Sequence, residues 1–256
     1  MCLIVFAWQL VPEMPLIAAA NRDEFLNRPS APAAVWLEHP HVYGGRDLQA
    51  GGSWMGVSEA GNTSGSTGAS RSGPRFAAIT NIRGAQERRL DAPSRGALVA
   101  DYLAGTLSAQ DYVEHIRQSS SHYNGFNLVL GDRHTLIWFS NRGQDDARNG
   151  VPLAPGIYGL SNGLLDSPWP KVLKTKAQFA SLLCQGAPNA AYFDMLADTA
   201  RAPDHRLPET GVALELERVL SAVCIAAPGY GTRTSTVVKL YAQGAVELHE
   251  VLIEQH

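Results

Sequence analysis

The chain has 256 residues, with 21 Lys and Arg, 24 Asp and Glu and a formal net charge of −3. Hydrophobic residues make up 45% of it and charged residues 18%, which excludes a wholly disordered, collagenous or coiled-coil chain. The negative net charge provides no general attraction for nucleic acid. Three widely spaced cysteines, at positions 2, 184 and 224, argue against a disulfide framework or a zinc knuckle.

The N-terminal third of the chain is predicted to form strands. Residues 3–8 are an unbroken apolar run with the length and composition of a buried strand, and residues 15–20 follow as a second strand after a short turn. Residues 21–61 indicate loops and short strands, and residues 76–81 indicate another strand. The first two strands should therefore form an antiparallel pair that begins at the N-terminus.

Helices and hairpins are predicted to alternate in the remainder. Helices are predicted over residues 94–103, 108–116, 168–183, 189–200 and 212–223, and hairpins over residues 126–139 and 234–253. Ser108 and Asp111 have the spacing of an N-terminal cap, and Pro168 and Pro170 suit a first helical turn. This order predicts an α+β fold with mostly antiparallel sheets, in one domain over residues 1–256.

The sequence pattern predicts neither a membrane-spanning segment nor a signal peptide. No run approaches the roughly 20 apolar residues that span a bilayer. No Lys or Arg precedes Arg22, so the positive start of a signal peptide is missing. We therefore expect a cytoplasmic protein without a membrane span, while its oligomeric state stays open.

Cys2 is the most informative residue for chemistry. A small side chain at position 2 permits removal of the initiator Met, which would leave a thiol and a free α-amine on one residue. An α-amine has a pKa of about 7.7–8.0, close to that of a general base for neutral pH. A thiolate is a strong nucleophile. The alternative is an inert Cys inside a buried strand. The apolar patterns around Cys184 and Cys224 indicate that these two cysteines are core residues.

A polar cluster follows the second predicted strand. It consists of Asn21, Arg22, Asp23 and Glu24. If the first two strands pair, this cluster lies near Cys2, where an Arg lowers a thiol pKa and an Asp can orient an amine. The alternative is a solvated charge run at a strand end.

The polar cluster resembles the signature of a known family. The Asn-Arg-Asp-Glu run is that of the NRDE-motif proteins, the transport and Golgi organisation protein 2 family. Further blocks match in order at residues 45–48, 51–57, 76–83, 94–96, 125–128, 158–162, 166–171 and 230–236. A Gly- and Ser-rich stretch at residues 62–74 departs from the family as an insertion, which should alter a surface loop and not the fold.

That family is similar in turn to N-terminal nucleophile hydrolases of the choloylglycine hydrolase and penicillin V acylase type. The resemblance implies a four-layer αββα sandwich with Cys2 as nucleophile at the end of a central strand. It implies that Asp23 binds the α-amine beside Arg22, that Asn162 donates to the oxyanion, and that Asn81 lies near the amine. Arg233 matches a late catalytic Arg. Ser58 stands where the hydrolases have an oxyanion-hole Asn, and a backbone N–H is the group it could supply.

Two functions follow from this resemblance. The first is an amidohydrolase or acyltransferase that cleaves an amide, ester or thioester through an acyl-enzyme on Cys2. The second is a non-catalytic protein that binds and moves haem, acyl-CoA or lipid in the same pocket. The expected partner is a small acyl substrate or a hydrophobic ligand. No metal or other cofactor is expected, with haem as a ligand only in the second case.

Overall fold

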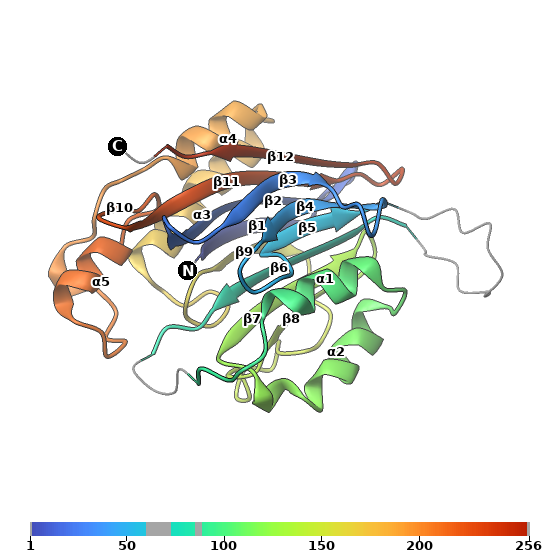
Figure 1. Cartoon of the computed structure of the whole chain (residues 1–256). Coiled ribbons are helices and arrows are strands. Elements are labelled where there is room, and N and C mark those ends of the chain that lie inside the picture. The colour runs from blue at the N-terminus through green and yellow to red at the C-terminus, as the bar shows by residue number, and fades with distance from the viewer. Residues whose placement is uncertain (1, 60–72, 85–88, 255–256) are drawn as a thin grey trace.

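The computed structural model describes residues 2–59, 73–84 and 89–254. Most of the predicted insertion, residues 62–72, lies outside the described residues. Two six-stranded sheets account for the strands of the described part, and helices cover the outer face of each sheet (Figure 1).

The N-terminal hairpin lies at the centre of the first sheet. Strands β1 (Cys2–Val11) and β2 (Met14–Phe25) pair antiparallel, with Cys2 opposite Arg22. The polar cluster lies within β2, whereas the sequence pattern ended this strand at residue 20. The strand continues because β2 also pairs with β11 (Tyr230–Leu240), so strands on both sides satisfy the backbone of its polar residues.

The first sheet has the strand order β10-β11-β2-β1-β9, with β12 also paired to β11. Its other strands are β9 (Gly156–Leu160), β10 (Ala226–Ala227) and β12 (Val246–Leu252). Strand β9 was not predicted, and it pairs antiparallel with β1. The second sheet is a meander of antiparallel neighbours in chain order. Its strands are β3 (Ser30–Val35), β4 (Val42–Asp47), β5 (Met55–Ser58), β6 (Arg75–Asn81), β7 (Phe126–Asp132) and β8 (Leu136–Ser140).

The helices follow the predicted positions, with ends shifted by a few residues. They are α1 (Gly96–Ala104), α2 (Ala109–Arg117), α3 (Pro170–Cys184), α4 (Asn189–Leu196) and α5 (Leu214–Leu220), with short 3-10 turns at Ser120–His122 and Asp204–Arg206. Ser108 caps α2 as predicted, because its hydroxyl accepts the N–H of Asp111 at 3.1 Å. Within the described ranges, no helix is long and apolar enough to cross a membrane.

Three apolar cores join these elements into four layers (Figure 1). The facing surfaces of the two sheets share one core, which includes Phe6 and Trp138. A second core joins the second sheet to α1 and α2, and a third joins the first sheet to α3 and α4. The predicted α+β sandwich with antiparallel sheets is therefore confirmed, with the layer order helix, sheet, sheet, helix.

Helix α3 lies close against β9 because Gly159 has no side chain. A Cβ at this position would lie 2.6 Å from Cγ1 of Val172, which is closer than any real contact. This close approach fixes the first turn of α3 over the end of the first sheet, where Cys2 begins β1.

Candidate active site

Cys2 lies at the first position of β1, a strand with neighbours on both sides. Its backbone carbonyl accepts a hydrogen bond from the Ser161 hydroxyl at 3.0 Å. Burial raises the pKa of the Cys2 thiol, while nearby Arg22 and a hydrogen bond from the Asp23 backbone act in the opposite direction. At neutral pH the thiol is therefore protonated and needs a base before it can attack.

Arg22 shares a sheet face with Cys2, because directly opposed residues of two antiparallel strands project to the same side. Its guanidinium stacks on the Trp54 ring at 4.0 Å from the centroid. Cys2, Arg22 and Trp54 line a cavity of about 10 Å³ between the sheets. That space is close to the minimum for one water molecule, so this face of Cys2 is closed to a larger molecule in this conformation.

Asp23 projects to the opposite face of β2, toward the α3 and α4 layer, because side chains alternate along a strand. It is 1% exposed, and its carboxylate accepts a hydrogen bond from the Thr232 hydroxyl at 2.7 Å. The Thr232 oxygen itself accepts the Ile225 N–H at 2.8 Å. Burial raises the pKa of Asp23, and the neighbouring Lys171 ammonium lowers it. Asn21, Arg22 and Asp23 are thus buried, unlike a solvated charge run, and Glu24 at the end of the polar cluster is half-buried.

Lys171 is a candidate site residue outside the set predicted from the sequence. It lies in the first turn of α3, is 3% exposed, and its Nζ has no hydrogen-bond partner within the described ranges. Burial lowers the pKa of Lys171 to about 8, while the charge of Asp23 acts against that decrease. A signal was present: Lys171 falls on the apolar helix face with Thr175 and Phe179, four and eight residues further on.

Asn162 and Asn81 meet where the two sheets come together. The Asn162 side-chain amide donates to the Asn81 backbone carbonyl at 2.8 Å. The Thr80 hydroxyl donates to the Ser161 carbonyl at 2.6 Å, so the end of β6 is joined to the segment after β9. Because Ser161 also binds the Cys2 carbonyl, this network places Asn162 near the start of β1. Asn81 contributes its backbone to the network.

Arg83 is a second residue that the sequence analysis left out of the site. Its guanidinium pairs with Glu217 of α5 at 2.6 Å, and both side chains are 4% exposed. It also lies over the Trp169 ring at 4.8 Å from the centroid. Burial lowers the pKa of Arg83, and the charge of Glu217 acts in the opposite direction. Arg83 therefore adds a second buried cation on the Asp23 side of the site.

Arg233 and Ser58 are not brought into contact with Cys2. Arg233 lies at a β-bulge, and its guanidinium donates to the carbonyls of Phe25 and Arg28 at 3.0 and 3.1 Å. It holds the turn that follows β2. Ser58 pairs with Arg75 at the start of β6, while Asn81 ends that strand. Six residues of strand separate these ends by about 20 Å, so the Ser58 backbone is remote from the site.

These features define a layered α+β sandwich whose first strand presents a cysteine beside buried charged and amide groups. The chain belongs to the Transport and Golgi organisation 2 family, whose sequence profile matches residues 1–255. It is 34% identical over 271 residues to the Transport and Golgi organization protein 2 homolog of Bos taurus, covering 98% of this chain and 92% of that protein. The human homolog is 33% identical over 273 residues with the same coverage. The Drosophila melanogaster protein is 32% identical over 200 residues, 72% of this chain and 65% of that protein.

Proposed function

We propose that the protein is an acyl-transfer enzyme, an amidohydrolase or acyltransferase that forms an acyl-enzyme on Cys2. The observation that carries this proposal is the position of Cys2 at the head of a central strand, directly opposite Arg22 and next to buried Asp23. The αββα layering supports the likeness to N-terminal nucleophile hydrolases, which the family resemblance implies. Cleavage of an amide, ester or thioester is the reaction class.

The α-amine of Cys2 supplies the missing base once residue 1 has been removed. Its pKa of about 7.7–8.0 suits removal of a proton from the thiol near neutral pH. The thiolate attacks the substrate carbonyl carbon, and a carbon–sulfur bond forms. The α-amine of Cys2 then gives its proton to the leaving group, which departs as an amine, alcohol or thiol. Water or a second amine then attacks the thioester, which releases the acyl group and restores the thiol.

The surrounding groups have roles in this scheme that match their positions. Asp23, fixed by Thr232, orients the α-amine and balances its charge. Asn162 donates one amide N–H to Asn81, which leaves its second N–H for the oxyanion. Such a donor contributes about 3 kcal/mol to stabilising the transition state in other enzymes. Arg22 favours the thiolate electrostatically.

A pair of chains that differ only before Cys2 tests the role of the amine. One chain is released from a cleavable fusion so that Cys2 is its first residue, and the other retains one Ala before Cys2. Cys2 acylation by an activated ester, followed by intact mass from pH 6 to 9, should be at least tenfold faster in the first chain near pH 8. Equal rates would contradict the proposal.

The remaining cysteines provide internal controls for this measurement. Cys184 is exposed at the end of α3, which corrects the core position expected for it, and Cys224 is buried. Cys184 should react equally in both chains. A Cys184→Ser background then leaves Cys2 and Cys224 as the thiols to compare, and Cys2→Ala identifies the modified site.

A second candidate function is ligand binding without catalysis, of haem, acyl-CoA or lipid. The cavity of about 10 Å³ beside Cys2 opposes catalysis, but without movement of Trp54 or Arg22 it admits these ligands no more than a substrate carbonyl. Burial also raises the pKa of the thiol and so opposes reaction. If exposure of the α-amine leaves Cys2 unreactive, titrations with haem and acyl-CoA test this function.

A further inference from the structure

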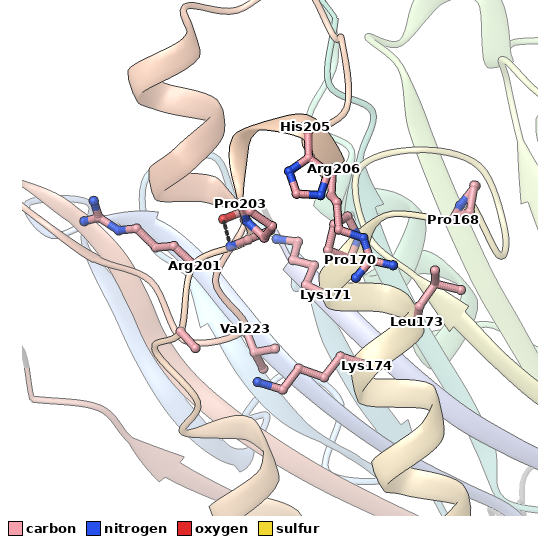
Figure 2. A pocket seen from close by; sticks show the side chains of 13 residues that line it. Pro168, Pro170, Lys171, Leu173, Lys174, Arg201, Pro203, His205, Arg206 and Val223 are labelled. Atoms are coloured by element: carbon pink, nitrogen blue, oxygen red, sulfur yellow. Dashed lines mark hydrogen bonds between the residues drawn. The ribbon is translucent and has the colours of Figure 1, made fainter.

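A large pocket lies on the helix side of the first sheet, next to the face that carries Asp23. It has a volume of about 600 Å³, within the range of roughly 300–1,000 Å³ typical of small-molecule sites. Its walls come from the first turn of α3, the 200–206 segment and residues near the end of α5 (Figure 2). The space is therefore sufficient for a small molecule, in contrast to the space between the sheets.

Cations dominate this pocket. Among the 13 residues that line it are Lys171, Lys174, Arg201 and Arg206, together with His205, and no Asp or Glu. Asp198 pairs with Lys174 and so offsets one of these charges, and Asp204 pairs with Arg218 outside the pocket, which leaves Lys171, Arg201 and Arg206 as its main cations. In a chain of net charge −3 this concentration of positive charge is local. It predicts a negatively charged ligand.

Lys171 provides the second observation. This residue is 3% exposed and lines the pocket, and its buried ammonium has no hydrogen-bond partner within the described ranges. Figure 2 shows the side chain extending from α3 toward Pro203, across the space between the two walls. A buried ammonium without hydrogen-bond acceptors is costly, and an oxyanion in the pocket would supply the acceptors.

The backbone at this wall also favours an anion. Helix α3 has 15 residues, and its N-cap residue Trp169 makes no side-chain capping bond. Because Pro170, Lys171 and Leu173 of the first turn line the pocket, the positive end of the helix dipole acts on the same space as the Lys171 ammonium.

We propose that this pocket binds an oxyanion, the phosphate or carboxylate group of a small molecule. Lys171 binds it at the buried side, and Arg201 and Arg206 bind it from the exposed wall. The proposal goes beyond the chemistry of Cys2 and is tested independently of it, because Arg201 and Arg206 take no part in acyl transfer.

Calorimetric titration at pH 7 and constant ionic strength tests the proposal, with inorganic phosphate and succinate as separate probes. We expect saturable binding of at least one of them by the wild-type chain. The double variant Arg201→Gln, Arg206→Gln should bind that probe at least tenfold more weakly, and its exposed positions make it a folded reference. Lys171→Met should abolish binding. Lys239→Gln, which removes one cation from β11 outside the pocket, should bind like the wild type.

The two probes identify the type of anion that binds, and the variants show whether it binds in this pocket. Binding of phosphate alone assigns a phosphate ligand, and binding of succinate alone assigns a carboxylate. Absence of binding by both probes, or equal binding by the wild type and the double variant, would overturn the proposal. The binding curve must saturate, because phosphate also stabilises proteins through its exclusion from their surface. That effect does not follow a single-site binding curve.

Discussion

The Cys2 site and the basic pocket lie on opposite faces of the first sheet and differ in almost every physical respect. Beside Cys2 the space is about 10 Å³, and its polar groups are held by backbone and side-chain bonds. The pocket is about 600 Å³, and exposed arginines form part of its wall. The first region has the fixed geometry that bond chemistry needs. The second has the open, charged character of a recognition site.

Strand β2 explains how one short segment serves both regions. Because its side chains alternate, Arg22 faces the second sheet and Trp54, whereas Asp23 faces the helices and Lys171. Lys171 belongs to both regions, since it lines the pocket and its charge acts on Asp23. Variants at Cys2 and variants at Arg201 and Arg206, which each belong to one region, therefore separate a reactive site from a binding site.

The largest effect is expected from Cys2→Ala in the chain that begins at residue 2. It should abolish acyl transfer, because no other thiol occupies the strand end. Stability should change little, with a melting temperature within about 3 °C of the wild type, since Ala keeps the strand position of this half-buried residue and only one sulfur atom is lost. Differential scanning calorimetry and intact mass check both statements. Retained activity, or a large loss of stability, would make Cys2 a structural residue.

Asp23→Asn should have the next largest effect, a loss of about 1–3 kcal/mol in the free energy of unfolding at pH 7. The substitution keeps the size of the side chain but leaves the buried Lys171 ammonium without its carboxylate neighbour. Urea unfolding measures the loss. Asp194→Asn is the matched control, because Asp194 is exposed on α4 and should cost less than about 0.5 kcal/mol.

A double variant sharpens that result. If Asp23 and Lys171 are coupled, Asp23→Asn with Lys171→Met should be more stable than Asp23→Asn alone, because the uncompensated charge is gone. Simple additivity of the two single substitutions would show that the two groups belong to separate regions.

Lys171→Met should also change how stability depends on pH. The folded-state pKa of Lys171 is about 8, below its ordinary value of 10.5, so the unfolded chain binds more protons between these values. The free energy of unfolding should therefore rise with pH in this window, by up to about 3 kcal/mol in the wild type relative to Lys171→Met. Urea unfolding at pH 7, 8, 9 and 10 measures the difference. Parallel curves for the two proteins would contradict it.

The fold was predictable where its signals are local. The Ser108 cap, the terminal hairpins and the apolar run of β1 follow from short-range patterns. Strand β9 was missed because it has five residues, two of them Gly, and pairs with β1 about 150 residues earlier. The length of β2 was missed for the same reason, since pairing with β11 keeps its polar end in the sheet.

The site was predictable only in part, for a related reason. A hairpin between the first two strands brings Cys2 close in space to Arg22 and Asp23, and the structure contains this hairpin. Lys171 and Arg83 are ordinary surface residue types, and distant segments bury them. Arg83, for example, is 134 residues from its partner Glu217. No short-range pattern predicts the burial of Arg83, whereas Lys171 shares the apolar face of α3 with Thr175 and Phe179.

The smallest effect concerns a helix remote from both regions and serves as their reference. Ser108→Ala removes the hydroxyl that accepts the Asp111 N–H at the start of α2. It should cost about 1 kcal/mol, or roughly 2–4 °C in melting temperature. Ser108→Asp keeps an acceptor and should restore most of the loss. Neither variant should alter Cys2 acylation or phosphate binding, because α2 packs on the outer face of the second sheet. If Ser108→Ala did alter either one, effects at Asp23 and Lys171 could not be separated from general loss of stability.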